Sequence, residues 1–192
     1  MQLRRLMKRI VNARIVVAVL VLGTVAAPAA AQNTPSKQDS FTGVWRSKAD
    51  KREKQQRLKA IEAATADMSI FIRGTARKRL GKGTAPPARM RLVVEGKRFT
   101  VARDGKSFSL QLGANPITVK KDGKQAKVSA RREGATIVVE SQGEKGRRVT
   151  RYALSSDGTC LTMSVRMRGK KLSGVLAFKA TFRRQATAEK GR

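Results

Sequence analysis

The sequence has no histidine, one cysteine and only 13 acidic residues among 192. Histidine is the usual general base of hydrolases and a frequent metal ligand, and a single cysteine cannot build a thiolate zinc site. The acidic residues are scattered singly, and no two of them stand out as a catalytic carboxylate pair. We therefore predict a protein that is not an enzyme, with no catalytic residues, no metal ligands and no cofactor.

Cysteine is too scarce for a fold stabilised by internal disulfides, and aromatic residues are too scarce to favour the recognition of unpaired nucleic-acid bases. Cys160 has no partner for an internal disulfide, so stability must come from an apolar core. Aromatic residues make up 4% of the chain. A run of arginines between positions 131 and 151 has only Tyr152 as an aromatic neighbour, which gives little support for recognition of unpaired nucleic-acid bases.

Positive charge is the abundant feature: 43 Lys and Arg residues give a formal net charge of +30. A field of this sign attracts polyanions and anionic membrane surfaces. The alternative interpretation is a solubilising surface with no partner, and the composition does not decide between the two.

The first 31 residues have the three parts of an export signal. An apolar run covers 15–25, and the small residues Ala29–Ala31 form an A-x-A cleavage site. The preceding basic residues are Arg4, Arg5, Lys8, Arg9 and Arg14. We predict cleavage near Ala31 and a protein that is periplasmic or secreted. No later segment approaches the roughly 20 apolar residues of a membrane-spanning helix.

The remainder is predicted to form one domain with short tails. Residues 32–40 are polar and predict a disordered leader, 41–185 the folded domain, and 186–192 a flexible tail. Within the domain, 48–81 is predicted to be a helical insertion because apolar residues recur there at spacings of three and four. These residues are Leu58, Ile61, Ala64, Met68, Phe71 or Ile72, Ala76 and Leu80. A cap at Asp67 or Ser69 would make a helix-turn-helix, and one long helix is the alternative.

From residue 89 onward apolar residues alternate with polar ones, as in half-buried strands. Pairs such as Asp104-Gly105 separate the runs about every ten residues, which is typical of hairpins. The predicted strands are 42–47, 89–95, 97–103, 106–112, 117–121, 124–132, 135–141, 146–154, 159–168 and 173–184. The predicted fold is mainly β, an up-and-down antiparallel barrel of about ten strands with a helix-turn-helix after the first strand. An open two-layer sandwich is the alternative.

The start of the domain, Phe41-Thr42-Gly43-Val44-Trp45, resembles the F-x-G-x-W opening of the calycin superfamily, which includes lipocalins and fatty-acid-binding proteins. The layout and the ending at 151–158 are similar to uncharacterised exported bacterial lipocalin-like proteins. The resemblance covers 41–184. It implies that Trp45 closes one end of the barrel against an arginine of the last strand, and Arg184 has the alternation for this role.

The sequence departs from this resemblance at one functional element. Fatty-acid-binding proteins carry R-x-Y on the last strand, which grips the ligand carboxylate. Here Ala180 and Phe182 occupy the corresponding positions, so that clamp is not carried over. The structural residues implied by the resemblance are Gly43, Trp45 and Arg184.

Two candidate binding regions follow. Apolar strand residues are predicted to line a ligand cavity inside the barrel, or alternatively to fill it as core: Phe99, Val101, Phe108, Leu110, Met163, Val165, Phe178 and Phe182. Basic residues of the helical insertion form a candidate anion or membrane patch, or alternatively a solvated helix face: Arg73, Arg77, Lys78, Arg79 and Lys82.

The expected function is therefore that of an exported, non-enzymatic binding protein for a small apolar or amphipathic ligand or a cell-envelope component. The alternative is a basic interaction module that binds polyanions, such as lipopolysaccharide or nucleic acid, or an anionic membrane surface. In that case the barrel is only a scaffold.

Overall fold

A computed structural model describes residues 39–48, 50–121 and 123–185. The predicted signal at 1–31, most of the leader and the tail at 186–192 lie outside these residues. A short 3-10 helix, η1, occupies Asp39–Phe41, at the end of the predicted leader. The helices and strands are β1 (Gly43–Ser47), α1 (Lys51–Ala64), α2 (Ile70–Thr84), β2 (Arg89–Glu95), β3 (Arg98–Arg103), β4 (Lys106–Gln111), β5 (Ile117–Lys121), β6 (Lys124–Glu133), β7 (Thr136–Gly143), β8 (Gly146–Leu154), β9 (Cys160–Gly169) and β10 (Leu176–Gln185).

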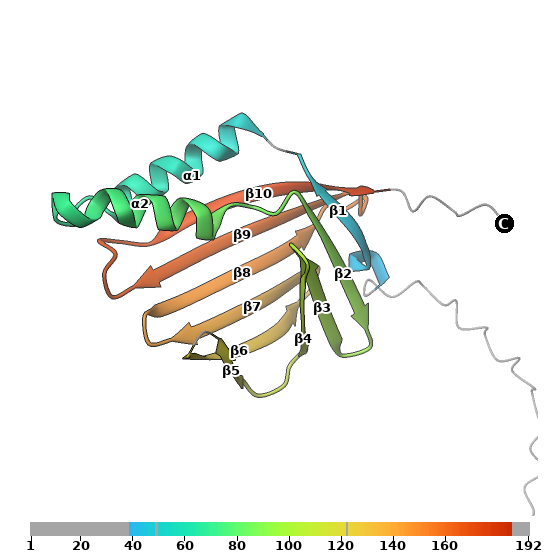
Figure 1. The fold of residues 1–192 in the computed structure, drawn as a ribbon. Helices are drawn as coiled ribbons and strands as arrows, with labels where there is room; N and C mark the ends of the chain where they lie inside the picture. Colours follow the sequence, from blue (N-terminus) through green and yellow to red (C-terminus); the bar gives the residue numbers. More distant parts are fainter. Residues whose placement is uncertain (1–38, 49, 122, 186–192) are drawn as a thin grey trace, which may run out of the picture. The chain divides into compact units, whose positions relative to one another are not determined.

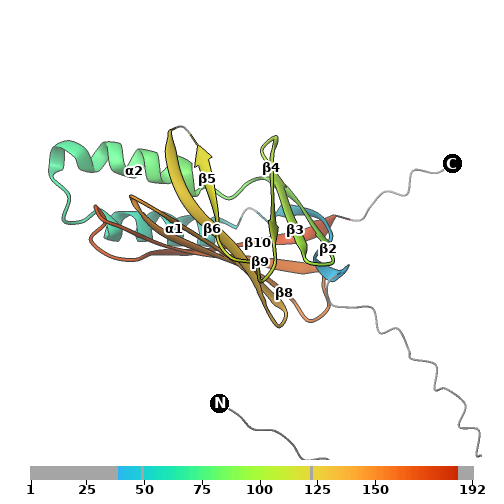
Figure 2. The ribbon, with the colours of Figure 1, turned by 90° about the horizontal axis from the view of Figure 1, so that it is seen from below.

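All ten strands belong to one antiparallel sheet in the order β4-β3-β2-β1-β10-β9-β8-β7-β6-β5 (Figure 1). The predicted up-and-down fold with two helices after the first strand is confirmed, and the sandwich alternative is wrong because there is one sheet. The sheet curls so that β2–β4 stand at an angle to β8 and β9 (Figure 2). The first and last strands of the chain, β1 and β10, are neighbours in the middle of this order, where Trp45 pairs with Arg184.

The predicted closure is interrupted between β4 and β5, which are the two ends of the strand order. Beyond β4, Leu112 makes an isolated bridge to Ala130 of β6, and the N–H of Gly113 donates to the Ala130 carbonyl at 2.8 Å. The sheet is therefore pinned at one point across this gap rather than by a continuous ladder.

The hairpin turns follow the chemistry of their residues. In the β3–β4 turn, Asp104 and Gly105 have φ angles of 50° and 69°. Two consecutive positive φ angles match a two-residue turn whose twist fits that of the flanking strands. The two residues thereby fix the register in which Arg103 faces Lys106.

Trp45 anchors one end of the sheet, which we call the closed end. Its side chain is fully buried, and its indole N–H donates to the Phe41 carbonyl at 3.1 Å. The Arg184 guanidinium lies 4.6 Å from the centre of the Trp45 ring and donates to the carbonyls of Thr42 (2.9 Å) and Ser40. A Cβ at Gly43 would lie 3.2 Å from Arg184 Nη1, so glycine leaves room for this guanidinium.

The helical insertion is a helix-turn-helix, not one long helix, and α2 runs to Thr84, three residues beyond the predicted end. Asp50 caps α1 by accepting from the Arg52 N–H at 2.7 Å. The helix packs along β10, where Glu53 accepts from the backbone and hydroxyl of Thr181 at 3.0 and 2.6 Å.

The predicted apolar stripe of the insertion is wrong at two of its positions, Leu58 and the position given to Phe71 or Ile72. Leu58, Phe71 and Ile72 are 42%, 91% and 54% exposed. Ile61 and Ala64 are buried against Leu176, as the stripe predicts. In the second half of the insertion α2 packs against α1, where Arg57 donates to the Gly81 carbonyl (3.0 Å) and to the Thr84 hydroxyl (3.2 Å), and Thr84 is the one buried residue of α2.

A candidate ligand-binding site at the open end of the sheet

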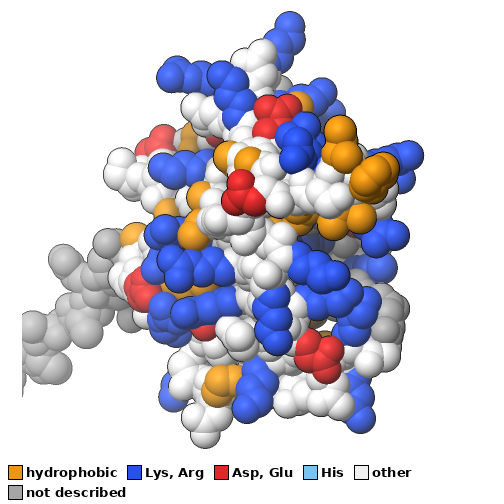
Figure 3. Space-filling model, turned by 90° about the vertical axis from the view of Figure 1, so that its left-hand side faces the viewer, with side chains coloured by type: hydrophobic (Ala, Val, Ile, Leu, Met, Phe, Trp, Pro, Cys, Tyr) orange, Lys and Arg blue, Asp and Glu red, His pale blue; other side chains and the backbone are white. Residues whose placement is uncertain are grey.

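A cavity of about 780 Å³ lies at the end of the sheet opposite Trp45, which we call the open end. It is bordered by α2 and by the residues around the β5–β6, β7–β8 and β9–β10 turns. Its apolar lining consists of Leu80, Ala126, Met167 and Leu172, and its charged lining of Arg79, Lys124, Glu144, Lys145, Arg147, Arg148, Arg168, Lys170 and Lys171. Figure 3 shows Lys and Arg side chains gathered over this side of the molecule.

The strands bring three inward-facing residues to the floor of this cavity. The register pairs Arg148 with Ser141 of β7 on one side and with Met167 of β9 on the other. Met167 and Leu80 also pack against the small cluster of Ile61, Ala64 and Leu176 beneath the helices. The cavity therefore has an apolar wall beside a guanidinium.

Arg148 is a half-buried cation without a carboxylate partner among the residues that the structure describes. Its one side-chain hydrogen bond is a long one, 3.4 Å from Nε to the Thr150 hydroxyl. Burial, and then the like charge of Arg103, lower the pKa of Arg148. An unpaired charge removed from water is costly, so this group favours an anion beside it.

Arg103 and Tyr152 lie close enough to Arg148 to act on its charge. Arg103 pairs with the inward-facing Met90, so it lies on the inner face of β3. Tyr152 packs its ring on Phe99, with centroids 5.7 Å apart. Burial raises the pKa of Tyr152, and the charges of Arg103 and Arg148 oppose this rise. Two guanidiniums and a phenol thus lie on the inner face of the sheet, close enough to influence one another's charge.

The alternation of residues in β8 already indicates in the sequence that Arg148 faces inward. Arg148 shares its parity with Thr150 and Tyr152, whereas Arg147 and Arg151 have the opposite parity. When the arginines between positions 131 and 151 are treated as one group, the inward-facing Arg148 is not separated from the outward-facing Arg147 and Arg151. The structure places Arg147 and Arg151 on the outer face in ion pairs with Glu140 (2.6 Å) and Glu133 (3.9 Å).

The eight residues predicted to line a ligand cavity do not line the cavity at the open end. Seven of them are buried side chains of the main core, namely Phe99, Val101, Leu110, Met163, Val165, Phe178 and Phe182. The eighth, Phe108, is 36% exposed because β4 is an edge strand. The interior around these seven residues is therefore filled, which is the alternative that the sequence left open, and the larger free volume lies nearer the helices.

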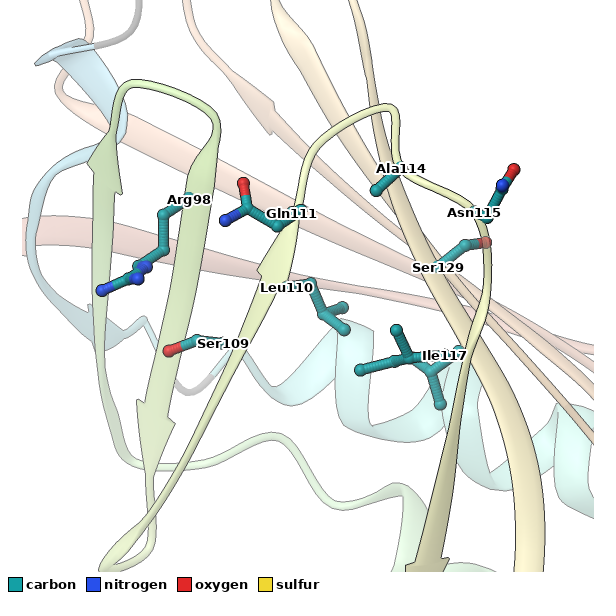
Figure 4. Close-up of a pocket in the computed structure, with 9 residues that line it drawn as sticks. Arg98, Ser109, Leu110, Gln111, Ala114, Asn115, Ile117 and Ser129 are labelled. Carbon is teal, nitrogen blue, oxygen red and sulfur yellow. The ribbon is translucent and has the colours of Figure 1, made fainter.

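A smaller cavity of about 320 Å³ lies at the gap between β4 and β5. Leu110 and Ile117 approach each other across it, with the polar residues Arg98, Ser109 and Gln111 on the β3–β4 side (Figure 4). Ile117 remains 49% exposed. The gap leaves apolar side chains of both edge strands in contact with solvent.

The predicted basic patch of the insertion is divided by the structure. Arg73 donates to the Met68 carbonyl at 2.8 and 3.1 Å, and Arg77 donates to the Thr65 hydroxyl at 3.2 Å. These two therefore stabilise the α1–α2 turn. Lys78, Arg79 and Lys82 are exposed, and Arg79 also borders the cavity.

Within residues 39–48, 50–121 and 123–185, no three His, Cys, Asp or Glu side chains are placed to hold a metal ion. Over the same residues, neither helix has the length and apolarity needed to traverse a bilayer.

No family model and no curated protein matches this chain. Solved structures do resemble it. Apo lipid binding protein 8 of Caenorhabditis elegans is 14% identical, with a TM-score of 0.47 over 77% of this chain and 96% of that one. A fatty acid-binding protein from Drosophila melanogaster brain is 13% identical (TM-score 0.46; 74% and 98%). Zebrafish ileal bile acid-binding protein with cholic acid is 14% identical (TM-score 0.47; 76% and 99%). These likenesses are too distant to transfer the role of any residue, so the chemistry of the site rests on its own geometry.

Proposed function

We propose that this protein is a non-enzymatic carrier that binds an anionic amphiphile in the cavity at the open end. The observation that carries the proposal is Arg148, an inward-facing guanidinium that lacks a carboxylate partner in the described chain and lies close enough to Arg103 for the two charges to repel. An anionic group between them would relieve this repulsion and accept charge-assisted hydrogen bonds. Tyr152 offers a further donor beneath.

The remaining lining suits the apolar part of such a ligand. Met167, Leu80 and Leu172 present apolar surface beside Arg148, and about 780 Å³ lies within the range of ordinary small-molecule sites. The exposed cations around the rim raise the local concentration of anions and speed their capture.

Replacing Arg148 tests this proposal. Arg148→Met keeps the aliphatic stem and removes the charge, so the affinity for a fluorescent long-chain fatty acid should fall by about 10- to 100-fold, the worth of a charge-assisted hydrogen bond. The methyl ester of the same probe should bind wild type and variant alike. Fluorescence titration at constant salt measures both.

The matched control is Arg166→Met, which removes the same charge from an exposed outer-face position of the neighbouring strand. It should change the affinity for the acid by no more than about twofold, as expected for surface charges. Equal losses in both variants, or equal binding of acid and ester by wild type, would contradict the proposal.

A second candidate function rests on Phe71, which is 91% exposed at the start of α2 between Ile70 and Ile72. We propose that this apolar tip, with the exposed Lys78 and Lys82 on the same helix, docks on an anionic bilayer.

Full burial of a phenylalanine side chain in the bilayer would contribute about 1.5–3 kcal/mol to the binding free energy. Phe71→Ala should therefore weaken binding to phosphatidylglycerol vesicles at least about tenfold in flotation assays. Leu58→Ala on α1 is the control, and equal vesicle binding by Phe71→Ala and wild type would refute docking.

We also propose that the chain acts outside the cytoplasm, on the strength of the basic, apolar and small-residue segments of 1–31. N-terminal sequencing of the exported protein should begin at Gln32 or within a few residues of it. Recovery of the uncleaved chain from the cytoplasm alone would refute export.

A further inference from the structure

Three arginines stand directly opposite one another on the outer face of the sheet. Arg46 of β1 pairs with Arg183 of β10 on one side and with Arg89 of β2 on the other. Their inward neighbours are buried, so these side chains face outward, and all three are exposed. Directly opposite residues have Cβ atoms about 4.5–5.5 Å apart. We call these three residues the arginine row.

Like charges placed directly opposite each other destabilise a sheet. Within the residues that the structure describes, no member of the arginine row forms an ion pair. The outer face of β6–β8 differs, because its arginines share two glutamates, with Glu140 lying 2.6 Å from Arg147 and 3.7 Å from Arg131. The repulsion along the arginine row is therefore not compensated by any acid among the described residues.

A groove borders the arginine row. Arg91 lies two residues beyond Arg89 on the same face of β2, about 6.7 Å further along the strand. Both arginines line a groove of about 420 Å³ that reaches the β3–β4 turn, where Arg103 and Lys106 add cations and Asp104 is the one acid of the lining. A ligand in this groove would meet several cations at spacings of about 5–7 Å.

We propose that the arginine row, with Arg91 and the groove, is a docking surface for the phosphates of double-stranded nucleic acid. Guanidinium groups bind phosphate oxygens in a bidentate way, and a duplex presents one phosphate charge per about 1.7 Å of its axis. A surface this size therefore meets several phosphates at once. Arg103 on the inner face also borders the groove, but the arginine row lies on the outer face, and the docking proposed for it does not depend on the function proposed for the open end.

The aromatic residues argue for a duplex rather than a single strand. The aromatic side chains of the strands are on the inner face or at the β4 edge, and Phe71 is on α2. Single-stranded binding draws much of its energy from bases stacked on aromatic rings. The outer face offers guanidinium groups but no such platform, so recognition is of the backbone and independent of base sequence.

The test uses the full-length chain and a fluorescent duplex in anisotropy titrations over a range of NaCl concentrations. The triple variant Arg46→Gln/Arg89→Gln/Arg183→Gln should bind at least about tenfold more weakly at low salt. Its plot of log K against log salt should be shallower by about 2.7, since each phosphate contact contributes about 0.9. Lys51→Gln/Lys54→Gln/Lys59→Gln, on α1, removes the same charge from exposed positions and should shift the slope by less than about 1.

Two further measurements keep the outcome decisive. Thermal melts should show the triple glutamine variant at least as stable as wild type, because repulsion is removed. The variant Arg46→Lys/Arg89→Lys/Arg183→Lys retains the charge and should keep the wild-type slope even if the variant with glutamines unfolds. The proposal is overturned if the α1 variant loses as much binding as the arginine-row variant. It is also overturned if single strands bind more tightly than duplex, or if heparin binds and duplex does not.

Discussion

Trp45→Ala should lower the free energy of unfolding by about 3–5 kcal/mol, the usual cost of truncating a buried large aromatic residue. The Trp45 side chain is fully buried, donates to the Phe41 carbonyl and carries the Arg184 guanidinium over its ring. The change leaves a cavity and also removes the partner of a cation at the junction of the first and last strands. Urea denaturation followed by circular dichroism measures the loss, since the only tryptophan is the one removed.

Phe71→Ala is the control for this prediction. It also truncates an aromatic residue, but one that is 91% exposed, so stability should stay within about 0.5 kcal/mol of wild type. If the two variants unfold at the same urea concentration, Trp45 does not anchor the closed end.

Gly146→Ala should lower the free energy of unfolding by about 2–4 kcal/mol, because it adds backbone strain together with steric overlap. Gly146 has a φ of 147°, and a Cβ there would lie 2.0 Å from the Arg168 carbonyl oxygen and 2.7 Å from the Gly169 Cα. Both contacts are with backbone, so β8 and β9 would have to separate at the rim of the cavity. Urea denaturation measures the loss, and ligand affinity should fall with it.

Gly74→Ala provides a matched glycine substitution with the opposite sign. Gly74 lies within α2 and has no atom within 4 Å of an added Cβ. Alanine there should stabilise the protein by about 0.5–1 kcal/mol, because glycine loses more conformational freedom in a helix. A Gly146→Ala variant as stable as Gly74→Ala would show that β8 and β9 are not packed this closely.

The strands could be predicted from the sequence because the local pattern of each segment indicates a strand. Alternation places β2, β5 and β8 at their observed bounds, and glycine turns separate neighbouring strands. The pairing of β1 with β10 could be anticipated from Trp45 and Arg184 only through a resemblance. Nothing local in the chain indicates that two strands so far apart in sequence are neighbours.

The candidate site was harder to predict because it depends on how side-chain volumes fill the interior, which the periodicity of apolar residues in the sequence does not reveal. Which inward side chains fill the space and which border a cavity is decided by residues from many strands at once. The sequence left Phe99 and Phe178 either as cavity lining or as core, and the structure buries both in the core, whereas Met167 and Arg148 border the free volume. The exposed Phe71 has a similar explanation, since a stripe at spacings of three and four indicates a helix face but not the partner that covers it.

The pairing of the two terminal strands has a consequence for how the chain folds. Arg184 donates to the carbonyl of Thr42, 142 residues earlier, so this ladder closes a loop that contains nearly the whole domain. Bringing such distant segments together costs more chain entropy than forming a hairpin, and contacts of this range slow folding. During synthesis β1 has no β10 to pair with until the last strand leaves the ribosome, and the Trp45 ring lacks its guanidinium partner for the same time. We therefore expect the hairpins from β6 to β9 to gain protection from hydrogen exchange before β1 does, and the fluorescence of Trp45 to report the last step of refolding.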